Sequence, residues 1–138
     1  MNSMFFVDDD AIIGAEVVRT LGSLGFKVEV APTVESGPSR AETARFDAIL
    51  VEFNVRSRRG LHPGLGNGLK VIRQLRALDV AAPVLMFNAM KGEPYETASL
   101  HAGADDFIPK TTSVLSAVSR IRAHIRRGEL ATCSKISL

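Results

Sequence analysis

The sequence predicts an α/β fold in which helices cover both faces of a parallel sheet. Five short apolar runs alternate along the 138-residue chain with segments of helical pattern. This alternation is typical of a parallel sheet, because each strand must return through a crossover before the next can run in the same direction. A chain of this length is expected to form one domain with a substantial hydrophobic core.

The start of the chain contains two predicted strands and the helix between them. Residues 4–7 (MFFV) are a short apolar run that ends at acids. Apolar residues then recur at helical spacing up to Gly25, which is expected to stop the helix; they are Ile13, Val17, Leu21 and Leu24. Residues 26–30 (FKVEV) alternate with a period of two, as in a strand with one less buried face.

The third strand follows a weak helix signal. Residues 33–46 carry Gly37 and Pro38 in the middle of a segment that should be helical. Because proline disrupts a helix interior, we expect a short or broken helix that ends near Arg45. Residues 47–52 (DAILVE) form the third predicted strand.

The second half of the chain completes the pattern. Residues 67–79 place one apolar side on a predicted helix, made of Leu69, Ile72, Leu75 and Leu78. Residues 83–87 (PVLMF) predict the fourth strand, residues 93–102 a short helix, and residues 105–110 (DDFIPK) the fifth strand. A final amphipathic helix is marked by Val114, Val118, Ile121 and Ile125. Residues 128–138 lack this period, so we predict a domain over 1–127 followed by a tail or linker.

Five βα units of this kind predict a doubly wound, flavodoxin-like sheet with the strand order 2-1-3-4-5. In such sheets the site forms beyond the carboxyl ends of the strands, where the strand order reverses. Polar residues stand at these ends: the run Asp8, Asp9 and Asp10, then Glu52, Asn88 and Lys110. We therefore expect acids, one amide and one ammonium on a single rim.

Glu52 interrupts an apolar run, and a buried carboxylate is costly unless it is paired. Carboxylates held roughly 4 Å apart repel by about 4 kcal/mol per pair in a surface-like dielectric, so the rim needs a cation. Lys110 is one candidate. Mg²⁺ is the other, because it takes oxygen ligands and keeps several waters.

Composition excludes several other classes of protein. The chain is 46% hydrophobic and 23% charged with a net charge of +2, which fits a globular protein and gives little support to nucleic-acid binding. The single cysteine, Cys133, cannot form an intrachain disulfide, which favours a reducing cytoplasm. No apolar run is long enough to span a bilayer, and the start lacks the pattern of a secretory signal.

Several separated motifs together resemble the receiver domains of bacterial two-component response regulators. They are FFVDDD, DAILVEFNV, NGLKVIRQLR, PVLMFNA and GADDFIPK, and the resemblance extends from residue 4 to about residue 127. It implies a signalling module of a phosphorelay rather than an enzyme. It also implies a histidine kinase or another signalling protein as partner, and a docking or homodimer face around the fifth strand and its flanking helices.

The resemblance also assigns roles to residues of the rim. It implies that Asp8, Asp9, the acceptor at position 52 and the carbonyl of Asn54 hold Mg²⁺. It further implies that Lys110 pairs with the phosphoryl group and that Phe107, three residues earlier, reports the conformational state.

Four departures from the family pattern fall on the parts that operate the phosphoryl switch. The acceptor position holds Glu52 instead of aspartate, and the fourth strand ends in Asn88 instead of Thr or Ser. Proline precedes Lys110 instead of following it. The connection after the acceptor is about eight residues longer than the family's usual one, with the insert at 56–66.

Glutamate exceeds aspartate by one carbon–carbon bond, about 1.5 Å of reach. We hypothesise that Glu52 permanently substitutes for the phosphorylated residue by pairing with Lys110 and accepting from the Asn88 amide. The alternative is a decayed site in which Glu52 points elsewhere. Both interpretations predict loss of ordinary phosphotransfer and weakened or lost Mg²⁺ binding.

Two other functions are left open by the sequence. DDDA after the first strand also fits a haloacid-dehalogenase-type phosphatase, with Asp8 as nucleophile and Asp10 as acid. The chain could instead be an ordinary phosphorylatable receiver from a larger regulator.

The insert at 56–66 and the last helix carry most of the clustered arginines. We interpret the insert as a solvated loop, with a lid or a contact for an acidic or phosphorylated partner as the functional alternative. The arginines of the last helix are predicted to form a solvated face; they are Arg120, Arg122, Arg126 and Arg127.

Overall fold

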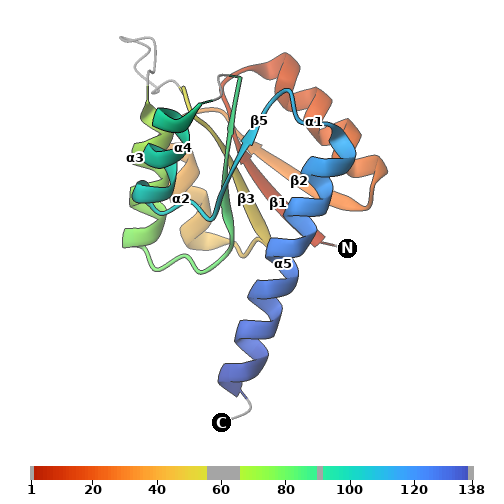
Figure 1. Cartoon of the computed structure of the whole chain (residues 1–138), viewed down its shortest axis with the longest axis vertical. Helices are drawn as coiled ribbons and strands as arrows, with labels where there is room; N and C mark the ends of the chain where they lie inside the picture. The colour runs from red at the N-terminus through yellow and green to blue at the C-terminus, as the bar shows by residue number, and fades with distance from the viewer. Residues whose placement is uncertain (1, 56–65, 90–91, 137–138) are drawn as a thin grey trace.

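The structure is a computed structural model that describes residues 2–55, 66–89 and 92–136, with side chains described as far as residue 131. Five strands form one parallel sheet in the order β2-β1-β3-β4-β5, which confirms the predicted flavodoxin-like fold (Figure 1). The strands are β1 (Asn2–Val7), β2 (Phe26–Ala31), β3 (Ala48–Glu52), β4 (Val84–Asn88) and β5 (Asp106–Pro109). The helices are α1 (Ala11–Ser23), α2 (Ser36–Thr43), α3 (Asn67–Ala77), α4 (Glu93–Ala102) and α5 (Val114–Ile136).

The sheet separates two hydrophobic cores because neighbouring residues of each strand face opposite sides. Helices α2, α3 and α4 cover one face, where Phe5, Val51 and Ile72 are buried (Figure 1). Helices α1 and α5 cover the other face, where Phe6, Leu50 and Ile121 are buried. The outer strand β2 is less buried, as its alternating sequence predicts.

The weak helix signal before β3 corresponds to a real but short helix. α2 has 8 residues, and its buried Gly37 and Pro38 lie in the first turn. Proline is tolerated there because the first N–H groups of a helix have no partner within the helix. The prediction of a short helix in this segment is confirmed.

The segment after residue 127, predicted to be a tail or linker, is helical as far as residue 136. Helix α5 continues to Ile136 and runs past the end of the sheet (Figure 1). An apolar period is needed only where a helix packs on a core, and this extension includes the good helix formers Glu129, Leu130 and Ala131. The domain boundary at 127 stays a prediction.

Two further predictions concern the loop at 56–66 and the absence of a membrane-spanning segment. Residues 56–65 of the predicted loop lie outside the described residues. No helix within the described ranges is both long and apolar enough to span a membrane.

Candidate functional site

The polar residues predicted to share a rim do lie at the carboxyl ends of neighbouring strands. Register pairs Val7 of β1 with Val51 of β3, so Asp8 and Glu52 follow side by side. Glu52 pairs with Phe87 of β4. Lys110 follows β5, and its backbone N–H donates to the carbonyl of Asn88 at 2.7 Å. The parallel sheet therefore brings residues about a hundred positions apart to one edge.

Glu52 and Lys110 form an ion pair at this edge, between a buried carboxylate and a partly buried lysine. The Lys110 Nζ lies 2.6 Å from Glu52 Oε2 and 3.9 Å from Asp8 Oδ2. Glu52 and Asp8 are 7% and 2% exposed, so both carboxylates are largely removed from water. Neither Asp8 Oδ2 nor Glu52 Oε2 has a hydrogen bond of good geometry to any described residue. The contact with Glu52 is thus a close charge pair that is poorly aligned as a hydrogen bond.

An aromatic side chain completes the surroundings of the lysine. The Lys110 Nζ lies 5.4 Å from the centroid of the Phe87 ring, within the range of a cation–π contact. Phe87 in turn packs edge to face on Phe6, with ring centroids 6.0 Å apart. The ammonium is consequently held between one aromatic face and two carboxylates.

Asp8 is the member of the cluster whose protonation is most perturbed. Burial raises the pKa of Asp8 from 3.8 to about 6. The hydrogen bond from the Asp10 backbone N–H and the charge of Lys110 lower the pKa in part, while the charge of Glu52 raises it further. One ammonium therefore does not fully compensate two buried carboxylates.

The raised pKa predicts how the stability of the fold depends on pH. The folded chain binds the Asp8 proton more tightly than the unfolded chain, so this group favours folding below its unfolded pKa of 3.8. That contribution is lost as the pH rises through about 6. The resulting cost at neutral pH is at most about 3 kcal/mol.

Asp8→Asn is therefore expected to raise the free energy of unfolding by about 1–3 kcal/mol near pH 7.5 and by much less near pH 4.5. The amide oxygen can still accept from the Asp10 N–H, whose bond to Asp8 Oδ1 is 3.0 Å long. Urea unfolding in metal-free buffer at both pH values measures the difference. A difference that is the same at both values would contradict the assigned perturbation.

Comparison with known proteins agrees with this geometry. A family model described as the response regulator receiver domain matches residues 4–122. The chain belongs to this family. A receiver is a signalling module rather than an enzyme, so the phosphatase alternative is set aside.

Relatives of the receiver include longer regulators. This chain is 35% identical over 129 residues to the transcriptional regulatory protein PrrA of Mycobacterium leprae, a match that covers 93% of this chain and 52% of PrrA. It is 28% identical to the transcriptional regulatory protein RstA of Escherichia coli, covering 98% of this chain and 53% of RstA. The chain spans about half the length of the curated relatives it matches.

A solved structure supports the same assignment. The BeF3-activated N-terminal receiver domain of Klebsiella pneumoniae RstA matches with a TM-score of 0.79 and 25% identity, covering 91% of this chain and 99% of that domain. A Burkholderia pseudomallei response regulator with a phosphorylated aspartic acid and a calcium ion matches at 19% identity and a TM-score of 0.74, covering 98% and 75% of the two chains. The second likeness concerns the fold alone.

Two side chains at or beside the predicted metal ligands bond to nearby backbone N–H groups. Asp10 caps α1 by accepting from the N–H groups of Ile12 and Ile13, each at 3.0 Å. The Asn54 side chain accepts from the Gly66 N–H at 2.9 Å. Within the described ranges, no three His, Cys, Asp or Glu side chains are grouped so as to hold a metal ion.

The switch residues of the receiver are all buried or half-buried. Asn88 is 1% exposed at the end of β4, and Phe107 is 3% exposed on β5. The Lys110 side chain is 20% exposed. Their positions match the places that the sequence motifs assign, while their roles in this chain stay proposals.

One residue near the site was not singled out by the sequence analysis. Gly68 at the start of α3 lies against the end of β3: its N–H donates to the Phe53 carbonyl at 2.9 Å, and an added Cβ would clash with the Glu52 carbonyl. The pair Asn67–Gly68 was a usable signal, because a glycine at a helix start can mark close backbone approach. At the other end of β5, away from the site, His124 Nε2 lies 3.1 Å from Asp106 Oδ2, and the His124 side chain is 14% exposed.

Proposed function

We propose that this receiver signals through protein binding, with Glu52 taking the place of a phosphorylated acceptor. The observation that supports the proposal is the 2.6 Å approach of Glu52 Oε2 to Lys110 Nζ in a buried pocket. The extra methylene brings the carboxylate to the lysine that, in the family, pairs with the phosphoryl group.

The same observation weighs against a decayed site in which Glu52 points elsewhere. A decayed acceptor has no reason to remain 7% exposed beside a second buried carboxylate, because burying charge costs free energy. The proposed pairing supplies that reason, since the ammonium compensates part of the cost. It also blocks the approach of a phosphodonor to the carboxylate.

Acetyl phosphate is therefore expected to leave the protein unmodified. The Glu52 carboxylate is paired with Lys110, and the longer side chain occupies space needed by the incoming phosphoryl group. Mass measurement of the intact protein after incubation with acetyl phosphate and Mg²⁺ tests this. A stoichiometric adduct of one phosphoryl group on Glu52 would refute the proposal.

Glu52→Asp is the matched control for that experiment. Aspartate withdraws the carboxylate from Lys110 by about one carbon–carbon bond and restores the acceptor of the family. We expect this variant to gain one phosphoryl group under the same conditions. If it also remains unmodified, Glu52 is not what prevents phosphorylation.

Mg²⁺ is expected to bind more weakly than micromolar affinity. Asp8 Oδ2 is a buried oxygen without a hydrogen bond to described residues, which suits a metal ligand, but the Lys110 ammonium lies 3.9 Å from it. The Glu52 carboxylate is already paired with the same ammonium. When bound, Mg²⁺ would supply positive charge that competes with Lys110 for these oxygens.

Titration calorimetry measures this competition directly. Lys110→Met removes the competing ammonium and is expected to tighten Mg²⁺ binding by at least about tenfold, a change of about 1.4 kcal/mol. Micromolar affinity in the unaltered protein, or no gain in the variant, would contradict the proposed ligand arrangement.

We propose a histidine kinase or another signalling protein as the partner of this receiver.

Helices α4 and α5 expose apolar side chains, with Leu100 48% and Leu115 77% exposed. These residues lie on the two helices that flank β5, so we retain the α4-β5-α5 face as the proposed homodimer surface. The alternative of a conventional receiver within a larger regulator is favoured only by the half-length match to PrrA and RstA.

A further inference from the structure

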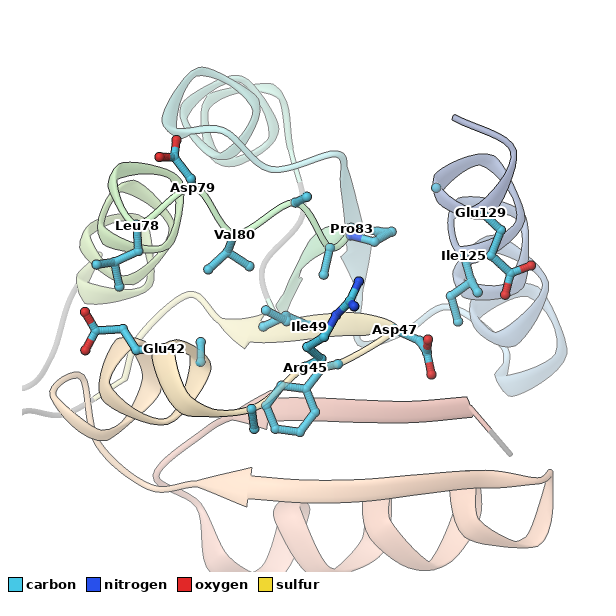
Figure 2. A pocket seen from close by; sticks show the side chains of 16 residues that line it. Glu42, Arg45, Asp47, Ile49, Leu78, Asp79, Val80, Pro83, Ile125 and Glu129 are labelled. Carbon is cyan, nitrogen blue, oxygen red and sulfur yellow. The ribbon is translucent and has the colours of Figure 1, made fainter. Parts of the chain in front are cut away.

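The described part of the chain contains a cavity of about 720 Å³ at the opposite end of the sheet from Glu52 and Lys110. Three segments surround it: the connection from α2 to β3, the connection from α3 to β4, and the part of α5 around Ile125 and Glu129 (Figure 2). This volume is within the range of small-molecule sites in proteins. The cavity contributes nothing to the site described above.

Apolar side chains form much of the wall, and the backbone behind them is held in place. The apolar lining includes Phe46, Ile49, Val80, Pro83 and Ile125. Phe46 stacks on the buried ring of Phe5, with centroids 4.6 Å apart and planes 10° apart. The Arg76 guanidinium donates to the carbonyls of Val80 and Ala82, at 2.8 and 3.1 Å. The wall is therefore formed before any ligand arrives.

Arg45 reaches into this cavity between Ile49 and Pro83 (Figure 2). Its backbone is fixed on both sides, because Ala44 N–H donates to the Arg40 carbonyl and Asp47 N–H donates to the Ser3 carbonyl. Within the described ranges its guanidinium has no hydrogen bond or ion pair, in contrast to Arg40 with Glu29 and Arg76 with Asp105. Arg45 is an exposed residue, and its guanidinium beside these apolar side chains suits a planar anionic group, which it can bind through two parallel hydrogen bonds.

The acids that line the cavity limit the charge of a ligand. Glu42 and Asp79 lie at the periphery of the view in Figure 2, away from the Arg45 guanidinium. Asp47 is partly engaged, because its Oδ2 accepts from the Ser3 N–H at 2.7 Å. Together with Glu129 these carboxylates would repel a multiply charged anion such as a phosphate ester. Because the lining carries four carboxylates and one guanidinium, an anion is favoured only if its single charge lies at Arg45 and away from these carboxylates.

We infer that this cavity is a binding site for a small amphipathic monoanion, with a carboxylate on Arg45 and an apolar body of aromatic size against Ile49, Val80 and Pro83. The inference does not depend on the proposed role of Glu52. It assigns this receiver a ligand site at the amino ends of its strands, separate from the rim that carries the acceptor position.

Three naphthalene derivatives of the same size test the inference on the intact chain. Naphthalene-2-carboxylate is the anionic probe, naphthalene-2-carboxamide the neutral one and 2-naphthylmethylamine the cationic one. Amide chemical shifts in nitrogen-15 NMR spectra report both affinity and location. We expect the carboxylate to bind at least about tenfold more tightly than the other two, with shifts confined to residues 41–49, 78–83 and 125–129.

Two variants and one control identify the group responsible. Arg45→Gln should abolish the preference for the carboxylate, and Glu129→Gln should strengthen it by removing a repelling charge. Arg40→Gln is the control, because Arg40 pairs with Glu29 elsewhere and its loss should leave binding unchanged. The inference is overturned if the amine binds most tightly, if Arg45→Gln binds the carboxylate as well as the unaltered protein, or if no probe shifts these residues at millimolar concentration.

Discussion

Lys110→Met is expected to lower the free energy of unfolding by about 3 kcal/mol at neutral pH, because it leaves two buried carboxylates without their cation. In the folded chain the Lys110 Nζ lies 2.6 Å from Glu52 and 3.9 Å from Asp8. The charge of Lys110 lowers the pKa of Asp8, so its removal should raise that pKa further above about 6. Urea unfolding near pH 7.5 measures the loss.

The double variant Lys110→Met/Glu52→Gln distinguishes the charge effect from lost packing. Neutralising Glu52 removes one of the two unpaired charges, and a neutral pair of similar volume is often as stable as the ion pair it replaces. We expect the double variant to recover at least half of the stability that the single variant loses. A double variant no more stable than Lys110→Met would mean that the ion pair is not the main stabilising contact of Lys110.

Gly68→Ala is expected to lower the free energy of unfolding by about 1–3 kcal/mol, because overpacking forces the backbone to move. An added Cβ would lie 2.9 Å from both Cα and O of Phe53 and would clash with the Glu52 carbonyl. These are backbone atoms of the last residue of β3 and of the residue that follows it, so no side chain can rotate to make room. The shift should also displace Glu52 from Lys110.

Gly22→Ala provides the matched control in another helix. Nothing lies within 4 Å of a Cβ at this position of α1. Alanine in place of a helical glycine should stabilise the protein by about 0.5–1 kcal/mol, because it reduces the conformational freedom of the unfolded chain. Equal effects of the two substitutions on unfolding by urea would show that the start of α3 does not press on β3 as described.

The strands and most helices were predictable from local pattern. The apolar runs of β1, β3 and β4 had to be buried on both faces, and α4 was predicted at its observed bounds. The convergence of Asp8, Glu52 and Lys110 also followed from the sequence, because parallel strands bring their carboxyl ends to one edge. The end of α5 was not predictable in the same way, since its last part runs past the end of the sheet and carries no apolar period.

The sequence was sufficient to predict which elements form, how the strands are ordered and which polar residues meet at one rim, because periodicity and chain order constrain all three. It could not determine the direction of the Glu52 side chain, the close approach of Gly68 to β3 or the place of the Arg45 guanidinium in its cavity. Those features depend on distances of a few ångströms between segments far apart in the chain, and such distances arise only when the helices pack on both faces of the sheet.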